Sequence, residues 1–351
     1  MSFLRIKNVE IKGVSACIPS KTEDNREYPF FAENELDRMI PTIGVQIRHV
    51  AEKDVTPSDM CYLAAEKLID ELGWEKESID VLIFNSPRRD YIVPDTACIL
   101  QDRLGLPNGT MAFDTNLGCT GWSYGISTIA SILSVGTMKR ALLLCGDVPS
   151  HNASYYDKTK YPLFSDCGTA TALEFKEDAT DIVCELGTDG AGYEGIIQRD
   201  GGARHPFTAE SLVMHEIGPG IKRSRMNSEM DGMNVFSFSM KRAPKSVKDL
   251  LEYIGKEVND IDTFFFHQAN LYMNKKICKK AGIDLEKVPF SIYDYGNTSN
   301  ASVPLTMVNN RRKELMDGFN KNVAVTFGLG LSWASVYFET NNLVVPEIIY
   351  C

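Results

Sequence analysis

The chain lacks any apolar run that approaches the roughly 20 residues a helix needs to cross a bilayer. It also lacks an excess of positive charge, because 37 Lys and Arg stand against 47 Asp and Glu. The resulting net charge of −10 argues against nucleic acid as a partner. The N-terminus has no signal-peptide pattern, since Arg5 and Lys7 interrupt alternating apolar residues typical of a strand. We expect neither a membrane nor a nucleic acid among its partners.

The nine cysteines never form a Cys-x-x-Cys pair. They also lack the spacing to the five histidines that is typical of metal sites. An odd number of cysteines without paired spacing indicates a reducing compartment. We therefore expect a cytoplasmic protein that holds no metal and no other cofactor.

With 351 residues, of which 44% are hydrophobic, the chain exceeds one average domain, and it has no low-complexity linker. Alternating short apolar runs and helical patterns predict an α/β fold. Strands are expected at 5–14, 81–85, 111–113, 141–145, 170–175, 182–186, 263–266, 323–327 and 332–338. Helices are expected at 60–72, 96–104, 120–135, 247–254 and 271–281. Residues 190–234 show little periodicity and predict a functional flap or pocket wall.

The chain also repeats itself at a constant offset of 182 positions. The matched pairs are Gly73 and Gly255, Ile79 and Ile261, Asn85 and His267, and Gly146 and Gly328. In this register the segment around Cys119 corresponds, with a small gap, to the segment around Asn297. A duplicated α/β unit would bring Cys119, His267 and Asn297 to one layer between two halves, 1–176 and 177–351.

Each of these three residues also has a structural interpretation when taken alone. Cys119 follows a short strand and begins a helical run, where unpaired N–H groups favour a thiolate nucleophile, but it equally fits a buried inert thiol. His267 ends a strand of three phenylalanines, at the junction where open α/β sheets place ligands. Asn297 follows a glycine and fits an ordinary turn or N-cap. The set of three therefore carries more information than any member.

The set resembles β-ketoacyl-acyl-carrier-protein synthase III, a branch of the thiolase-fold condensing enzymes. The motifs are Gly44-Val-Gln-Ile-Arg48-His49, Cys119-Thr-Gly, Phe164-Ser-Asp-Cys-Gly-Thr-Ala170, His267-Gln-Ala-Asn270, Gly296-Asn-Thr-Ser299 and Phe327-Gly-Leu-Gly-Leu-Ser-Trp333. Elongating condensing enzymes use two histidines, so Asn297 favours the type III branch. The resemblance implies a duplicated thiolase-like fold of five layers, α-β-α-β-α, and a homodimer.

The resemblance also implies a mechanism. Cys119 would take an acyl group from a thioester, and malonyl on acyl-carrier protein would lose carbon dioxide and attack it. His267 and Asn297 would stabilise the enolate, and the backbone N–H groups of Cys119 and Leu329 would form the oxyanion site. Substrates would arrive as acyl-carrier-protein phosphopantetheine or coenzyme A thioesters. The alternatives are acyl transfer to an alcohol or amine without decarboxylation and, less favoured, a non-catalytic partner of another condensing enzyme.

The sequence departs from the family pattern at four positions. Arg38 and Thr42 stand where coenzyme A-primed members have a Trp and an Arg that grip adenine, which predicts a carrier-bound donor or a differently held coenzyme A. Val93, before Pro94, replaces a large aromatic residue that reaches across the dimer, which predicts a longer or branched acyl chain. Leu329 replaces a common glycine and keeps the backbone donor while it changes the pocket wall.

Docking of an acidic carrier requires a local basic surface on this acidic chain. The predicted helix 271–281 carries Lys275, Lys276, Lys279 and Lys280, which form two like-charged i,i+4 pairs. We expect this helix to bind acyl-carrier protein, although a solvated face explains the same pattern. A second, weaker candidate is formed by Lys222, Arg223 and Arg225.

Overall fold

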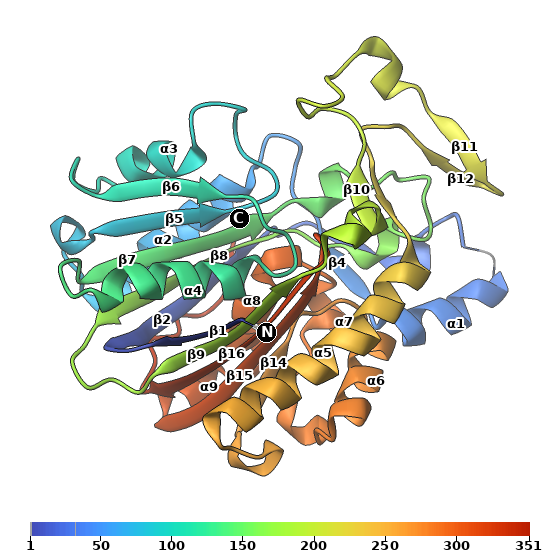
Figure 1. The fold of residues 1–351 in the computed structure, drawn as a ribbon. Coiled ribbons are helices and arrows are strands. Elements are labelled where there is room, and N and C mark those ends of the chain that lie inside the picture. The colour runs from blue at the N-terminus through green and yellow to red at the C-terminus, as the bar shows by residue number, and fades with distance from the viewer. Residues whose placement is uncertain (1, 32) are drawn as a thin grey trace.

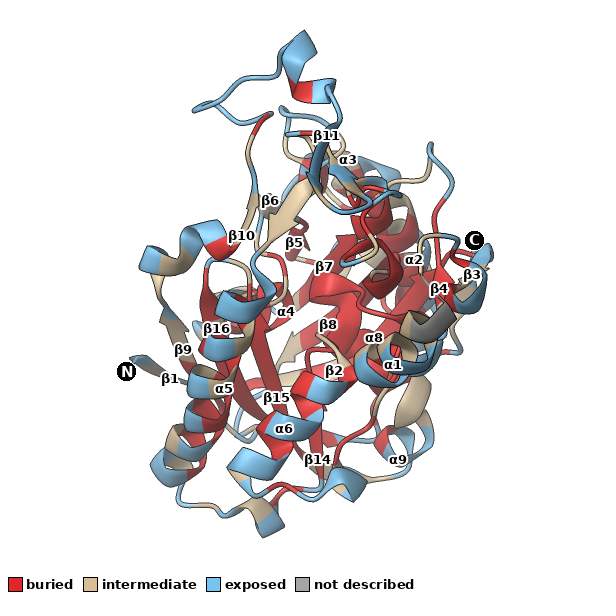
Figure 2. Cartoon of the chain, turned by 90° about the vertical axis from the view of Figure 1, so that its right-hand side faces the viewer, coloured by how far each residue is buried: buried red, intermediate tan, exposed pale blue. Residues whose placement is uncertain are grey.

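Two mixed β-sheets form the centre of the computed structural model, which describes residues 2–31 and 33–351 (Figure 1). One sheet has the strand order β17-β2-β8-β7-β5-β6, with bounds Ile349–Tyr350, Val9–Ile18, Cys167–Phe175, Arg140–Asp147, Val81–Asn85 and Met111–Thr115. The other has the order β1-β9-β16-β15-β14, with bounds Ser2–Ile6, Ile182–Thr188, Ser332–Asn341, Phe319–Gly328 and Thr263–Phe266. The central strands of both sheets are buried on both faces (Figure 2).

Helices lie between and outside the sheets. α4 (Gly121–Ser134) and α8 (Ser302–Asn310) pack in one apolar cluster with strands of both sheets. α2 (Pro57–Leu72) and α3 (Thr96–Arg103) cover the outer face of the first sheet, and α5 (Gly232–Ile254) and α6 (Leu271–Ala281) cover that of the second. Five layers, α-β-α-β-α, result, and the predicted fold class is confirmed.

The side chains of β7 alternate between the two faces of the sheet, and both faces are apolar, so the strand is a continuous apolar run in the sequence. Ala141, Leu143 and Cys145 belong to the central cluster, whereas Leu142 and Leu144 pack towards α2 and α3. Successive side chains of a strand point to opposite faces, so a sheet covered on both faces needs apolar residues at every position.

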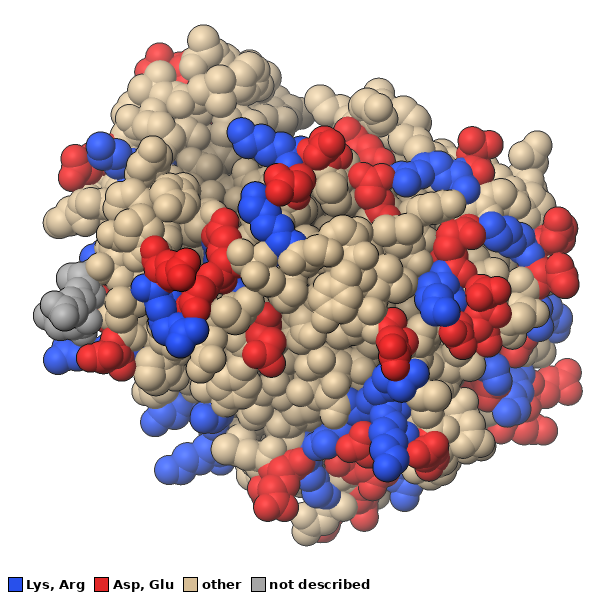
Figure 3. All heavy atoms as spheres, turned by 180° about the vertical axis from the view of Figure 1, so that it is seen from behind, with Lys and Arg blue, Asp and Glu red and all other residues tan. Residues whose placement is uncertain are grey.

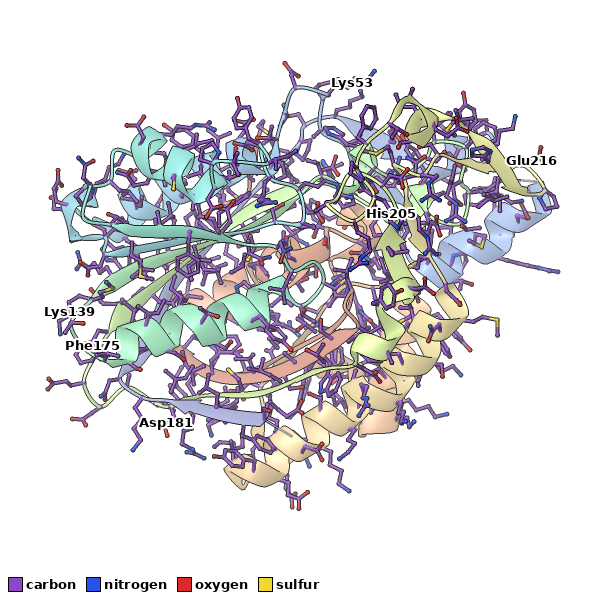
Figure 4. All side chains as sticks on the ribbon, turned by 45° about the horizontal axis from the view of Figure 1, so that its top comes forward. Lys53, Lys139, Phe175, Asp181, His205 and Glu216 are labelled. Carbon is purple, nitrogen blue, oxygen red and sulfur yellow. The ribbon has the colours of Figure 1, made fainter. Side chains whose placement is uncertain are left out.

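The repeat of 182 positions is visible as matched local structure. α2 and α5 both end at a left-handed glycine, Gly73 and Gly255. The Asp80 carboxylate accepts the Lys139 N–H at 2.5 Å, and 182 positions later the Asp262 carboxylate accepts the Lys321 N–H at 2.7 Å. The same hydrogen bond thus ties the start of β5 to β7 and the start of β14 to β15. Lys139, labelled in Figure 4 beside Phe175, also lies 3.8 Å from the centroid of that ring.

Several predicted elements require correction. The expected strand 5–14 is two strands of different sheets, β1 and β2, separated near Asn8, whose φ is 62°. The expected helix 247–254 begins much earlier, at Gly232, because the helix accommodates Pro244 and Asp231 caps its N-terminus. Outside the stretch 190–234, the α-helices and strands that the sequence patterns did not predict are α1 (Glu33–Ile43), α7 (Ile292–Tyr295), α8, α9 (Arg312–Met316), β3 (Thr22–Asp24), β4 (Ile47–His49) and β17.

The stretch 190–234 is an arm that projects from the body and is exposed over much of its length (Figures 1 and 2). Two short ladders form within it, β10 (Ile196–Gln198) with β13 (Ser228–Met230) and β11 (His215–Gly218) with β12 (Ile221–Arg223). Figure 4 labels His205 and Glu216, both exposed residues of this arm.

The division into halves 1–176 and 177–351 remains a prediction. Each terminal strand pairs with the sheet of the other half, β1 with β9 and β17 with β2. In the part of the chain that is described, no helix combines the length and apolar character that crossing a membrane requires.

Candidate active site

A cavity of about 270 Å³ opens between the two sheets and the arm. Cys119, His267, Asn297 and Leu329 all line it, although Cys119 and Leu329 are more than 200 residues apart along the chain. The arm supplies part of the wall through β10 and β13. The predicted pocket-wall role of the stretch 190–234 is therefore confirmed.

The loop between β6 and α4 carries Cys119, and Asn85 at the end of β5 holds this loop. The Asn85 side-chain oxygen accepts the Leu117 N–H at 3.2 Å, and its amide donates to the Leu117 carbonyl at 2.9 Å. α4 starts at Gly121 directly against Asn85, because a Cβ on Gly121 would lie 2.0 Å from the Asn85 amide nitrogen. Cys119 thus precedes the helix by two residues. The sequence pattern had placed it in the first turn of the helix, and this prediction is wrong.

Burial raises the pKa of the Cys119 thiol, so the prediction that its position would favour the thiolate is wrong. Desolvation is the largest effect, and hydrogen bonds from the backbone N–H groups of Leu329 and Cys119 only partly offset it. The negative charge of Asp147 raises the thiol pKa further. At rest the Cys119 side chain is therefore a neutral thiol.

His267 follows the last residue of β14 and is only 1% exposed. Its backbone N–H donates to Val325 of β15 at 2.8 Å, which fixes the position of the residue at the sheet edge. The ring nitrogen Nδ1 lies 2.8 Å from the Ser302 hydroxyl. Burial lowers the pKa of His267 to about 4, while a backbone hydrogen bond with Ser299 raises it. The imidazole is therefore neutral near pH 7.

Asn297 is 5% exposed and its side chain is oriented by two hydrogen bonds. Its carbonyl oxygen accepts the Ser299 N–H at 2.9 Å, and its amide donates to the Ala269 carbonyl at 3.3 Å. One amide hydrogen thus remains for the cavity. The backbone of Asn297 pairs with the segment 163–165 of the other half.

Asn300 joins the two halves next to this site. Its amide nitrogen donates to the carbonyls of Asn85 at 2.8 Å and Gly146 at 3.2 Å, at the ends of β5 and β7. The segment that carries Asn297 is thereby fixed to the strand ends beside the Cys119 loop.

The turn 328–330 closes the cavity next to the thiol. A Cβ on Gly328 would lie 2.6 Å from the Cys119 sulfur, so this position requires glycine. The Leu329 side chain is accommodated over Gly118, since a Cβ built there would lie 3.5 Å from the Leu329 Cβ. Leucine therefore keeps its N–H near the sulfur and adds an apolar surface to the wall.

Sequence analysis missed three charged residues that line the cavity, namely Arg88, Asp147 and Lys160. Asp147 is 2% exposed and forms an ion pair with Arg88. Lys160 is also 2% exposed. Of these three residues, only Asp147 could have been recognised from the local sequence, because it is a polar residue at the end of the apolar strand β7.

The four lysines of α6 are all exposed, on the helix whose first turn reaches the cavity through Asn270 and Met273. Figure 3 shows that on one face of this acidic molecule positive and negative side chains are interspersed around an area without charge. A negative net charge is therefore compatible with a local basic surface. The weaker candidate differs, since Arg223 pairs with Asp157 and Arg225 with Asp200.

The positions that depart from the family pattern lie outside the cavity, except for Leu329. Arg38 and Thr42 are exposed on α1, where the Thr42 hydroxyl donates to the Arg38 carbonyl at 2.6 Å. Val93 is 79% exposed on the loop before α3 and does not line the cavity of the single chain.

Comparison with known proteins identifies the family. Residues 113–190 match the family 3-oxoacyl-(acyl-carrier-protein) synthase III, and residues 251–340 match its C-terminal region. β-Ketoacyl-(acyl-carrier-protein) synthase III of Desulfitobacterium hafniense is 30% identical over 93% of this chain and 96% of its own. A putative 3-oxoacyl-(acyl-carrier-protein) synthase 3 of Campylobacter jejuni is 31% identical over 98% of each chain.

A solved structure agrees with both relatives. The 3-oxoacyl-(acyl-carrier protein) synthase from Burkholderia xenovorans is 35% identical, aligns over 100% of this chain and 99% of its own, and superposes with a TM-score of 0.93. The resemblance predicted from the sequence motifs is confirmed: the chain is an enzyme that belongs to the 3-oxoacyl-(acyl-carrier-protein) synthase III family.

Proposed function

We propose that the chain joins an acyl group to a malonyl unit by decarboxylative Claisen condensation, with Cys119 as nucleophile. The observation that carries this proposal is one cavity lined by Cys119, His267 and Asn297, with two backbone N–H groups directed at the thiol. Family membership supplies the reaction class, and the geometry supports a role for each residue.

In the first step the Cys119 sulfur attacks the carbonyl carbon of an acyl thioester. The carrier sulfur leaves and takes a proton, so the acyl group becomes a thioester of Cys119 and the carrier is released as a thiol. Because burial raises the Cys119 pKa, the thiol proton must be removed as the bond forms. The N–H groups of Cys119 and Leu329 would bind the negatively charged oxygen of the tetrahedral intermediate.

In the second step malonyl on acyl-carrier protein loses carbon dioxide and leaves an enolate. Its oxygen needs hydrogen-bond donors, and the free Asn297 amide hydrogen and His267 Nε2–H suit this task. For Nε2 to carry the proton, Nδ1 must accept a hydrogen bond, and the Ser302 hydroxyl at 2.8 Å can donate one. The low His267 pKa supports this role, because a neutral imidazole stays a donor without taking the proton.

The enolate carbon then attacks the acyl-Cys119 carbonyl and the Cys119 sulfur leaves. The product is a β-ketoacyl chain two carbons longer on the carrier. We also propose that the carrier docks on Lys275, Lys276, Lys279 and Lys280, on the helix whose N-terminal residues Asn270 and Met273 form part of the cavity wall.

We propose that the protein works as a homodimer in the cytoplasm. β6 is an edge strand whose outer side has no partner among the described residues, and Met111 on it is 43% exposed. Tyr91, Ile92 and Val93 are 63%, 80% and 79% exposed on the neighbouring loop. Contiguous exposed apolar residues beside an unpaired strand favour a partner subunit at this edge.

Intact mass spectrometry tests the function directly. Wild-type protein and Cys119→Ala are incubated with acyl-carrier and acyl-coenzyme A thioesters, and malonyl-carrier is then added. The proposal expects an acyl adduct on wild type alone, formed faster from the carrier donor, which discharges into an extended β-ketoacyl product. An adduct that malonyl-carrier leaves untouched would favour acyl transfer to an alcohol or amine, for which the altered Leu329 wall leaves room.

A further inference from the structure

Lys160 carries a buried amino group in the wall of the cavity that contains Cys119. It is 2% exposed and stands in the segment between β7 and β8, just before Tyr161. Removing a charged amine from water is expensive unless the surroundings replace its hydration. The partners of this ammonium group therefore indicate whether its role is purely structural.

The neighbours of Lys160 satisfy only part of its hydrogen-bonding capacity. Its Nζ donates to the Ser228 carbonyl and to the Ser228 hydroxyl, each at 2.6 Å. The Phe164 ring centroid lies 5.7 Å away. An ammonium group has three N–H donors, and the third meets no acceptor in the part of the chain that the structure describes.

No carboxylate balances this charge by direct contact within residues 2–31 and 33–351. One oxygen of the nearby Asp157 accepts from the Thr159 N–H and hydroxyl, and the other forms an ion pair with Arg223 at 3.3 Å without a hydrogen bond. Arg88, the other cation of the cavity wall, is neutralised by its ion pair with Asp147. Among the described lining residues Lys160 is thus the one cation without a carboxylate.

We propose that Lys160 determines acyl specificity by binding a carboxylate at the far end of the acyl chain that Cys119 carries. The substrate class is therefore a short dicarboxylic acid joined through one carboxyl group to the carrier thiol. This inference rests on the proposed acylation of Cys119 and adds the identity of the acyl group.

The two other anions that enter such a site fit Lys160 less well. The malonyl carboxylate leaves as carbon dioxide, and binding it to a cation would stabilise the reactant and slow its loss. The phosphate of phosphopantetheine is separated from the reacting thioester by the whole pantetheine arm, whereas Lys160 is almost fully buried and lines the same cavity as Cys119. A carboxylate at the far end of the acyl chain avoids both problems, because it is not lost in the reaction and it enters the cavity together with the acyl group.

The test compares two acyl groups of equal length on pantetheine, the thiol arm shared by both natural carriers. Glutaryl-pantetheine carries the distal carboxylate and pentanoyl-pantetheine does not. Intact mass spectrometry measures the rate at which each loads Cys119 on wild-type protein. We expect glutaryl to load faster than pentanoyl, because a charge-assisted hydrogen bond distinguishes two such ligands by about 10- to 100-fold.

Two substitutions at Lys160 separate charge from packing. Lys160→Met keeps the length of the side chain, and exchange of a buried charge for an apolar group is compatible with folding. We expect it to lower the glutaryl-to-pentanoyl ratio by about 10- to 100-fold while pentanoyl loading persists. Lys160→Arg should keep most of the ratio. Lys158→Met, two residues away and paired with Glu35 outside the cavity, is the matched control and should leave the ratio unchanged.

The pH dependence of this ratio adds a second readout. The pKa of Lys160 is lowered to about 7, mainly by burial and in part by Arg223 and Arg88, while Asp157 and Glu229 act in the opposite direction. The ratio should fall as the pH rises through about 7 in wild type and stay level in Lys160→Arg. Titration of the Cys119 thiol affects both substrates equally and cancels in the ratio.

Equal loading of both acyl groups by wild type, or a ratio that Lys160→Met does not change, would overturn the assignment of Lys160. Absence of any Cys119-dependent adduct with either thioester would instead contradict the proposed function itself. The two failures are therefore distinguishable in one experiment.

Discussion

The corresponding strands β5 and β14 make the same hydrogen bond where they start but carry residues with different contacts where they end. At the starts of β5 and β14, Asp80 and Asp262 make the same carboxylate-to-backbone hydrogen bond. At the ends of the same strands, Asn85 holds the Cys119 loop through hydrogen bonds, whereas His267 lines the cavity itself. The matched hydrogen bonds at the starts of the strands support the fold in the same way, whereas at the strand ends Asn85 supports a loop and His267 forms part of the cavity wall.

The strongest way to break this comparison is to remove the reacting groups of the second half. His267→Ala and Asn297→Ala should each lower condensation by about 10² to 10³, because each removes one donor to the enolate oxygen. Acylation of Cys119 should change far less, since its oxyanion donors are backbone N–H groups. Stopped-flow or quenched assays of the two half-reactions check this, and an equal loss in both steps would contradict the assignment.

Acid should destabilise the second half through a group that the first half does not have. Burial lowers the pKa of folded His267 to about 4, against about 6.5 when unfolded. The unfolded state therefore binds a proton first, and the stability contributed by the neutral imidazole is full above pH 6.5 and lost as the pH falls towards 4. The loss is on the order of 3 kcal/mol.

Urea denaturation of wild type and His267→Gln between pH 7 and 4.5 measures this loss. Glutamine does not titrate, so the variant should lose less stability over this range. The matched substitution Asn85→Gln replaces one uncharged amide by another and should leave the pH dependence of wild type in place. Parallel curves for wild type and His267→Gln would show that the histidine is not the titrating group.

The shared end of the strands should respond equally in both halves. Asp80→Ala removes a carboxylate that accepts the backbone N–H groups of Lys139 and Arg140, and Asp262→Ala removes one that accepts the Lys321 N–H. Each should cost about 1 to 2 kcal/mol of unfolding free energy. Asp80→Asn and Asp262→Asn retain a carbonyl acceptor and should cost less. Chemical denaturation gives all four values. A large loss of unfolding free energy for only one of the two aspartates would show that the two hydrogen bonds do not contribute equally to stability.

The motifs predicted the five layers through the family that they resemble, and together with the repeat they singled out three residues that line one cavity. Both signals depend on local residue order. They missed Lys160 and Arg88, since no local pattern distinguishes a lysine that becomes buried from one that stays exposed. They also gave the wrong pKa direction for Cys119, because burial has the largest effect on this thiol and the local sequence does not show how deeply a side chain becomes buried. The start of α5 was missed because Pro244 predicts an interruption that the long helix accommodates.

The smallest effect concerns the helices that follow the compared strands. α6 after β14 carries four exposed lysines, whereas α3 after β5 carries one arginine, Arg103, that pairs with Asp59. If α6 binds the acidic carrier, Lys275→Glu with Lys279→Glu should raise the KM for the malonyl-carrier by about 3- to 10-fold, since charges at the rim of an interface contribute about 1 kcal/mol or less each. The kcat should hold, because both residues lie outside the cavity.

Two controls make this last comparison informative. Acylation of Cys119 by a pantetheine thioester, which lacks the protein carrier, should be unchanged in the double variant. Reversal of charge at Arg103 on α3 should leave the KM unchanged, because only the second-half helix reaches the cavity entrance. Added salt should narrow the difference between wild type and the double variant, as it does for exposed charges. If neither the substitutions nor salt changed the KM, the lysines of α6 would be ordinary solvent-exposed residues. The carrier would then have to bind another surface.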